Sequence, residues 1–273
     1  MDILEAIRVR HSTRNFDGSP LTDADHESIA SFIAATRPPF GVHARIELIR
    51  ADFGDERVKL GTYGSVKGAR DFMGLIYGQG PLAQEGSAYW FEQVVLHCTS
   101  IGVSSIWLAG FTHSSFSKHV TLAPGETLGY ACPLGYEGGQ RPLAERIGLW
   151  NSQKLHAAKK PFETLFLTAD GQPLAPQAAG DWELPLQMTR IAPSAKNLQP
   201  YRVVVTPEAC HFHIQPSSGI PSGPGWFSRI DVGIAMCHFE QTCLHEGLSG
   251  AYEVLPGVPA LPGREYVISY VRR

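Results

Sequence analysis

The sequence of 273 residues lacks two features that would tie it to a membrane or to nucleic acid. It has no apolar run of about 18 residues, which a membrane-spanning helix requires, and its first residues, MDILEAIRVRHSTRNF, lack the apolar core of a signal peptide. It has no basic excess either: 23 Lys and Arg stand against 26 Asp and Glu. Binding driven by nucleic-acid phosphates or by an anionic membrane surface is therefore not expected. We expect a cytoplasmic protein.

Paired cysteines are also missing. The five cysteines are scattered along the chain and form no C-x-x-C motif, which is typical of free, buried thiols in a reducing compartment. They are Cys98, Cys132, Cys210, Cys237 and Cys243.

The familiar catalytic motifs are absent as well. There is no Walker A motif, no G-x-S-x-G and no H-E-x-x-H. GQGPLA at 78–83 imitates a dinucleotide-binding fingerprint, but Pro81 interrupts it and no acidic residue follows about 20 positions later. The cysteines and histidines between Cys237 and His245 would point in different directions on one helix, so no metal site is expected. The absence of these motifs suits a protein whose chemistry is done by a bound cofactor.

The first half predicts helices at 3–9 and from residue 21, with Thr22 as N-cap and Asp25 three residues later. Strands are predicted at 45–51 and 71–78, and VSSIWLAGF is predicted to be a strand entering a glycine turn. Between them lies a helix in which Trp90, Val94 and Cys98 recur at helical spacing, and Gly102 is a C-cap candidate.

The second half repeats this layout. It predicts a strand at 201–205, a long helix from residue 231 closed by Gly247, and a terminal strand at 265–273. WFEQVVLHCTSIGVSS and AMCHFEQTCLHEGLSG can be overlaid with Gly102 on Gly247. The repeat favours an α+β fold made of two tandem half-domains, 1–155 and 156–273, although amphipathic helices that end in glycine are common.

Four segments resemble conserved motifs of the nitroreductase family. LEAIRVRHSTRNF is similar to the opening helix and its Arg-x-Ser-x-Arg turn, and APSAKNLQPYRVVV is similar to the Pro-Ser-Ala-x-Asn-x-Gln-Pro segment. IGVSSIWLAGF resembles the Gly-Leu-Gly-x-x-Trp-x-x-Gly-Phe turn, and LGYACPLGY resembles the Leu-Gly-Tyr stretch that precedes basic residues. The resemblance implies a nitroreductase-like fold with mainly antiparallel sheets flanked by helices, and FMN as cofactor.

The motifs are divided between the halves. The first half has RHSTR but reads ATRPPFGVHARIELI at the Pro-Ser-Ala position, whereas the second half has APSAKNLQP and no RHSTR. This division resembles the fused, pseudo-dimeric branch of the family, in which one of two sites survives. The resemblance implies a monomer that is an internal pseudo-dimer and holds one FMN.

The family pattern assigns the cofactor phosphate to Arg10 and Ser12, and the N1/C2=O edge of the flavin ring to Arg14. Cationic side chains and hydroxyls are the donors that a phosphate needs, and alternate residues of an extended turn point the same way. A cation at the N1 edge also stabilises the anionic reduced flavin. The alternative is a solvated polar turn.

The resemblance makes Arg141 a further phosphate candidate and assigns the remaining candidates to the ring-facing parts of the site. The Pro-Ser-Ala loop would close over the ring and ribityl chain, and the segment after Ile106 would form a wall beside the ring, with Gly110 allowing close approach. Each assignment has a structural alternative. Pro193 would only stop a helix, Trp107 and Leu108 would pack in the core, and Arg141 would lie on a solvated arm. All candidates are Arg10, His11, Ser12, Arg14, Trp107, Leu108, Ala109, Gly110, Arg141, Pro193, Ser194, Ala195, Asn197 and Gln199.

The resemblance implies an NAD(P)H-dependent FMN oxidoreductase that passes electrons to a small electron-poor acceptor such as a nitroaromatic or a quinone. Two alternatives stay open. The first is a flavin-binding or sensing protein with little turnover, which the divergent first-half segment RPPFGVHAR favours. The second is a flavin-consuming or dehalogenating enzyme of the same fold.

Overall fold

The structure, a computed structural model, describes residues 1–50, 66–108, 119–139, 158–215 and 227–273. The chain divides into two compact units, which we call unit 1 (Met1–Lys154) and unit 2 (Leu155–Arg273). Within the described ranges, no helix has the length and apolar character needed to cross a membrane.

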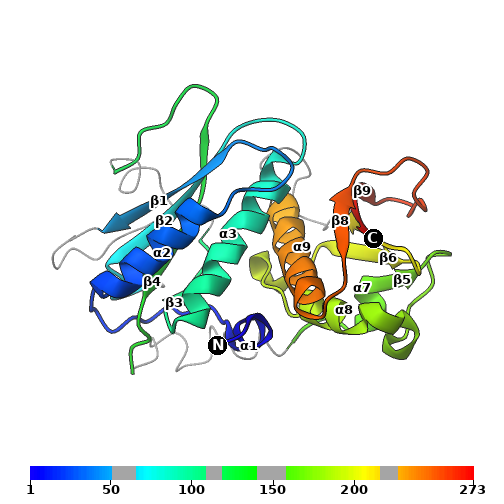
Figure 1. The fold of residues 1–273 in the computed structure, drawn as a ribbon, viewed down its shortest axis with the longest axis horizontal. Helices are drawn as coiled ribbons and strands as arrows, with labels where there is room; N and C mark the ends of the chain where they lie inside the picture. The colour runs from blue at the N-terminus through cyan, green and yellow to red at the C-terminus, as the bar shows by residue number, and fades with distance from the viewer. Residues whose placement is uncertain (51–65, 109–118, 140–157, 216–226) are drawn as a thin grey trace. The chain divides into compact units, whose positions relative to one another are not determined.

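Unit 1 is an antiparallel sheet with helices packed on it (Figure 1). Its strands lie in the order β1-β2-β4-β3, and α3 packs on β1 and β2 while contacting α1 and α2. Its described elements are α1 (Ile3–Val9), α2 (Asp23–Ala35), β1 (Ala44–Arg50), β2 (Asp71–Tyr77), α3 (Ala83–Ser100), β3 (Ser104–Ser105) and β4 (Thr127–Gly135).

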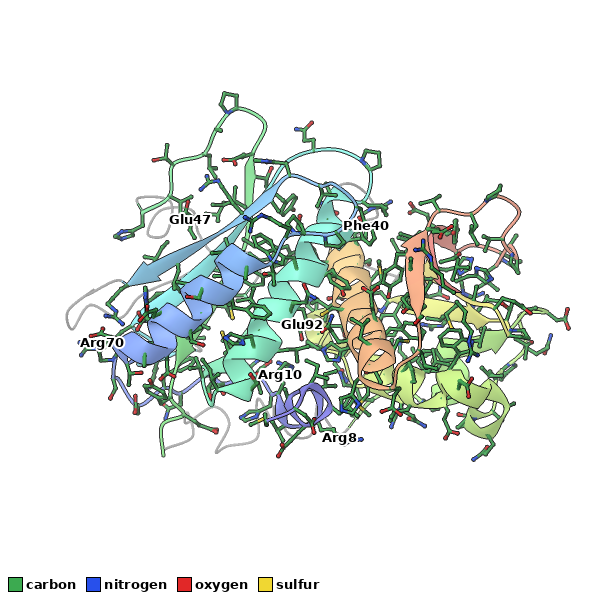
Figure 2. The ribbon with its side chains drawn as sticks, in the orientation of Figure 1. Arg8, Arg10, Phe40, Glu47, Arg70 and Glu92 are labelled. Carbon is green, nitrogen blue, oxygen red and sulfur yellow. The ribbon has the colours of Figure 1, made fainter. Side chains whose placement is uncertain are left out.

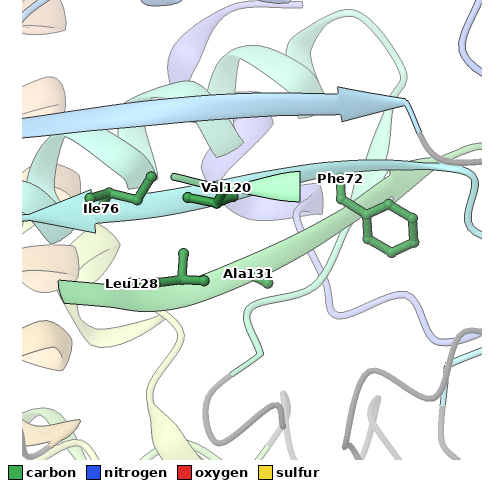
Figure 3. Close-up of a cluster of buried hydrophobic side chains, with 5 residues drawn as sticks. All are labelled: Phe72, Ile76, Val120, Leu128 and Ala131. Atoms are coloured by element: carbon green, nitrogen blue, oxygen red, sulfur yellow. The ribbon is translucent and has the colours of Figure 1, made fainter. Parts of the chain in front are cut away.

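The centre of this sheet is fully buried. Every residue of β2 is buried, which fits a strand covered on both faces. Phe72 and Ile76 of β2 join Leu128 and Ala131 of β4 in one apolar cluster, which Val120 completes (Figure 3). This cluster anchors the segment that precedes β4.

Unit 2 has a five-stranded sheet in the order β5-β6-β7-β9-β8. Neighbouring strands are antiparallel except β5 and β6, and α9 packs on α8, β6 and β7. Its described elements are α7 (Phe162–Leu165), β5 (Phe166–Thr168), η2 (Pro176–Trp182), α8 (Glu183–Arg190), η3 (Ala195–Asn197), β6 (Tyr201–Val205), β7 (Ala209–Ile214), α9 (Phe227–His245), β8 (Gly250–Glu253) and β9 (Glu265–Arg272).

The two units repeat one topology. In unit 1 the order β1-β2-α3-β3-β4 along the chain gives a sheet β1-β2-β4-β3, and in unit 2 the order β6-β7-α9-β8-β9 gives β6-β7-β9-β8. Even the irregularities correspond, because the β2–β4 register shifts at Gly129 and the β7–β9 register shifts at Val267. The α+β fold with mainly antiparallel sheets flanked by helices is therefore confirmed.

The two long helices also end in the same way. Gly102 and Gly247 follow α3 and α9 with φ of 85° and 71°, the left-handed conformation that glycine adopts without strain. The N–H of Val103 donates to the carbonyl of Cys98, and the N–H of Leu248 donates to the carbonyl of Cys243. Both bonds belong to the Schellman motif, and the overlay of Gly102 on Gly247 predicted the correspondence.

Other predicted elements were found close to their expected bounds. The opening helix and the strand at 201–205 are observed at the same residues, and Thr22 caps α2 by accepting from the N–H of Asp25. VSSIWLAGF is less regular than predicted, since β3 covers Ser104–Ser105 and Leu108 forms an isolated bridge with Ala131.

Candidate functional site

The turn that follows α1, residues 10–14, is held between two segments of unit 1. Ser12 pairs with Ser105 as a parallel bridge, and the N–H of Thr13 donates to the carbonyl of Ser105 at 3.0 Å. On the other side, the carbonyl of Arg14 accepts from the N–H of Lys67 at 2.9 Å. This ribbon, which we call the Arg10 turn, therefore has a fixed backbone, and it lies next to the segment that carries Trp107.

Arg10 is buried at the start of this turn. Its exposed fraction is 3%, and its Nε and Nη1 atoms have no hydrogen-bond partner among the described residues. Burial lowers the pKa of Arg10, and the negative charge of Glu92 acts in the opposite direction. An unsatisfied guanidinium inside a protein costs free energy. An anion that accepts from Nε and Nη1 would remove that cost.

Thr13 adds a second unsatisfied donor to the turn. Its exposed fraction is 3%, and its Oγ1 has no partner among the described residues. His11, Ser12 and Arg14 are half-buried. Sequence reasoning missed Thr13 because alternation along an extended turn singles out residues 10, 12 and 14. The buried donors in the turn are thus a cation and a hydroxyl, a combination that suits a phosphate.

The Trp107 segment forms a packed wall in unit 1. The Trp107 ring meets Phe91 and Tyr130 edge-on, with centroids 4.7 and 5.6 Å apart, and its Nε1 donates to Oε2 of Glu92 at 2.7 Å. Leu108 is buried, and its N–H and carbonyl both pair with Ala131. Both side chains are therefore packed in the unit, as the core alternative expects. Ala109, Gly110 and Arg141 lie outside the described residues.

The loop Pro193–Gln199, called here the Pro-Ser-Ala loop, has a strained backbone in unit 2. Lys196, Asn197 and Gln199 adopt φ of 51°, 56° and 44°, a conformation that costs free energy for residues other than glycine. Ser194 Oγ accepts from the N–H of Gln199 at 3.0 Å, and the Asn197 amide donates to the carbonyl of Ala158 at 2.9 Å. Such a backbone persists only where its surroundings hold it.

Gln199 fixes the loop from inside. Its side chain is fully buried; Oε1 accepts from the N–H of Lys160 and Nε2 donates to the carbonyl of Arg190, both at 2.8 Å. Because both ends of the amide are used within unit 2, the Gln199 side chain shapes the loop.

Asp231 of α9 holds the same loop through Ala195. Its carboxylate oxygens accept from the Ala195 N–H at 3.0 and 3.2 Å, and its exposed fraction is 3%. Burial raises the pKa of Asp231 to about 8. Sequence reasoning missed this residue, although an aspartate beside the apolar run VGIAM on a predicted buried helix was the available signal.

Metal ligands do not cluster in the part of the chain that the structure describes, since no three His, Cys, Asp or Glu side chains come together there. His238, which lies in the Cys237–His245 segment, is fully buried, and its Nδ1 lies 3.2 Å from the carbonyl of Met188.

Comparison with known proteins gives the family. The family model described as "Putative TM nitroreductase" matches residues 2–243. A protein from Thermotoga maritima described in similar terms superposes with a TM-score of 0.61 at 16% identity, over 99% of this chain and 94% of its own. A nitroreductase with bound FMN from Desulfitobacterium hafniense has a TM-score of 0.41 at 19% identity, over 51% of this chain and 91% of its own. Comparison with curated proteins found no match.

The family model spans most of the sequence, so the chain belongs to the nitroreductase family. Membership makes it an oxidoreductase by class, and the superposition on the Thermotoga maritima protein agrees with the fold.

Proposed function

We propose that this protein is an FMN-dependent oxidoreductase that takes electrons from NAD(P)H. The observation that carries the proposal is Arg10, a buried guanidinium with two donor atoms that find no acceptor among the described residues, in a member of the nitroreductase family. The nitroreductase from Desulfitobacterium hafniense holds FMN, and FMN is the cofactor that we assign to this chain.

The Arg10 turn fits the phosphate of FMN. A phosphate ester carries nearly two negative charges and accepts several hydrogen bonds, so it can satisfy Arg10 Nε and Nη1, and the Thr13 hydroxyl is a further donor of the same turn. Ser12 supplies a further hydroxyl, and His11 belongs to the same turn. Arg14 would stabilise negative charge at the N1/C2=O edge of the ring when the flavin is reduced.

The other candidates orient the ring in this proposal. The Pro-Ser-Ala loop is assigned to the ring and the ribityl chain, and Asn197 and Gln199 hold its strained backbone through their bonds to Ala158 and Arg190. Trp107 and Leu108 hold the start of the wall. The proposal also includes Ala109 and Gly110 as ring candidates and Arg141 as a phosphate candidate, three residues that lie outside the described ranges.

Bound FMN would supply the redox chemistry, which is hydride acceptance from NAD(P)H and electron delivery to an electron-poor acceptor such as a nitroaromatic or a quinone. In this proposal the chain's own part is to bind the cofactor, to orient it and to bias its charge. We propose that the chain is a monomer whose two halves form an internal pseudo-dimer, and that it holds one FMN.

The absorption spectrum of the purified protein, with the ratio of flavin to chain, tests the cofactor. We expect a ratio near one, and loss of FMN in Arg10→Gln because the cationic donor is removed. Arg8→Gln is the matched control, since Arg8 is exposed in the last turn of α1 (Figure 2). A protein that stays colourless after incubation with FMN would refute the proposal.

Turnover needs a separate test. Stopped-flow mixing with NADH and with NADPH should bleach the bound flavin rapidly. A flavin that binds at one per chain and stays oxidised with both nucleotides would favour the flavin-binding or sensing alternative.

A further inference from the structure

Glu92 of α3 is a buried carboxylate that none of the proposed cofactor contacts uses. Its exposed fraction is 0%, and its Oε2 accepts from Nε1 of Trp107 at 2.7 Å. Arg10 follows α1, which packs against α3, and Figure 2 labels both residues in this part of unit 1. A carboxylate is costly to bury unless it is compensated. The Trp107 donor and the charge of Arg10 both contribute to that compensation.

Two groups act on the charge of Arg10 and raise its pKa against the effect of burial: Glu92 of α3 and Cys132 of β4. Burial raises the pKa of Cys132 to about 12, so its thiol is neutral near pH 7. Glu92 is therefore the internal counter-charge of Arg10.

This counter-charge has opposite effects on folding and on anion binding. Without a ligand, Glu92 offsets the buried positive charge of Arg10 and so favours the folded chain. When a phosphate reaches Arg10, the same carboxylate repels it, since like charges in a medium of low polarity interact strongly.

We infer that Glu92 is a positioning residue that keeps the empty Arg10 site folded and limits how tightly that site holds a phosphate. The inference rests on the proposed function, because it takes the phosphate of FMN as the anion. It assigns Glu92 a role in cofactor exchange. The site is preformed, and its affinity for the phosphate is lower than it would be without the charge of Glu92.

The test compares FMN with riboflavin, which has the same ring and ribityl chain but no phosphate. The measured quantity is the Kd for riboflavin divided by the Kd for FMN, from titration of flavin fluorescence with the apoprotein. In Glu92→Gln, which removes the charge and keeps an acceptor for Trp107, this ratio should rise roughly tenfold. Apo Glu92→Gln should also unfold at a lower temperature than the wild type. Glu92→Asp, which keeps the charge, should leave the ratio within about twofold of wild type.

A double variant covers the case in which Glu92→Gln does not fold. In Arg10→Gln with Glu92→Gln both buried charges are removed together, so neither charge is left buried without the other. The ratio should be higher in this double variant than in Arg10→Gln alone. A ratio that is unchanged or lower when Glu92 is neutral would overturn the inference, as would an equal change in both flavin affinities.

The wild type separates failure of this inference from failure of the proposed function. Wild-type protein that binds neither flavin would refute the proposed function, and the role of Glu92 would fall with it. Wild-type protein that prefers FMN, with a preference that does not respond to the charge at residue 92, would refute the role of Glu92 alone.

Discussion

Asp231 in α9 accepts the N–H of Ala195 with both carboxylate oxygens, at 3.0 and 3.2 Å, and so ties the Pro-Ser-Ala loop to the long helix of unit 2. Its carboxyl group is buried, with a pKa raised to about 8 by that burial and lowered in part by the Ala195 N–H. Ionisation of Asp231 in the folded chain therefore costs free energy, so the contribution of this group to stability depends on pH.

This linkage predicts a pH dependence of stability. The ordinary pKa of this group is 3.8, so between about pH 4 and pH 8 the folded chain holds a proton that the unfolded chain has lost. The stabilisation by this proton is full below the pKa of Asp231 in the unfolded chain, and it is lost as pH rises through the pKa of Asp231 in the folded chain. We expect the free energy of unfolding to fall by up to about 1.4 kcal/mol per pH unit across this range, measured by urea denaturation.

Asp231→Asn is the matched control for that measurement. The amide oxygen can still accept from Ala195 but does not titrate in this range, so the difference in stability between the variant and the wild type isolates Asp231. The comparison is needed because burial lowers the pKa of His211 and His213, which gives a slope of opposite sign. Parallel pH profiles for the two proteins would show that Asp231 is ionised over the whole range.

Local signals in the sequence were sufficient for much of the fold. Gly102 and Gly247 marked the ends of two long helices because a left-handed residue after a helix favours glycine, and Thr22 marked a helix start because its hydroxyl can accept a free N–H. The overlay of the two helices anticipated a repeat that the strand order now extends to the sheets. The overlay compared only two helices, but the repeat it indicated includes the strand order of both units.

Residues whose environment depends on distant partners were harder to predict. β7, ACHFHI, is buried throughout, yet its histidines read as polar positions; Nδ1 of His211 lies 2.7 Å from Oγ of Ser269 on the neighbouring strand. Glu92 looks like a solvated helix residue until Trp107, fifteen positions away, is seen to donate to it. Burial of a charged group is decided by its partner, which the local sequence does not specify.

The close approach of Gly129 to Tyr77 gives a prediction about the sheet of unit 1. Gly129 is the extra residue of β4 at the register shift, and a Cβ built there would overlap the Tyr77 ring. Gly129→Ala should destabilise the protein by about 1–3 kcal/mol, because the buried ring has to move. Gly139→Ala is the control, since a Cβ there meets nothing within 4 Å. Equal thermal unfolding of both variants would count against the contact.

Glu126 gives a prediction for acid conditions. Its carboxylate accepts from Arg45 Nε at 2.9 Å and Arg45 Nη2 at 2.8 Å, and from the N–H of Ala123 at 2.8 Å. The Arg45 hydrogen bond, followed by that of Ala123, holds the pKa of Glu126 well below its usual 4.5. Its contribution to stability is thus present above pH 4.5 and is lost as pH falls below it.

Glu126→Gln tests that contribution. The variant should be less stable than the wild type by about 1–3 kcal/mol at pH 7, and the difference should shrink toward pH 3, as measured by urea denaturation at both values. Glu47→Gln, at a half-exposed partner of the same Arg45, should cost less than about 1 kcal/mol. A difference at residue 126 that does not change with pH would contradict the assignment.

Gln199 provides a test of the Pro-Ser-Ala loop that is independent of charge. Gln199→Leu keeps the volume but leaves the N–H of Lys160 and the carbonyl of Arg190 without their buried partner, at a cost of about 1–3 kcal/mol for each. The strained loop should then relax. Because the loop is proposed to face the ring rather than the phosphate, the affinities for FMN and riboflavin should fall by the same factor, as titration of flavin fluorescence would report. Gln177→Leu, at an exposed position of η2, should change neither affinity. If only the affinity for FMN fell, Gln199 would have to be assigned to the phosphate side of the site and not to the ring side.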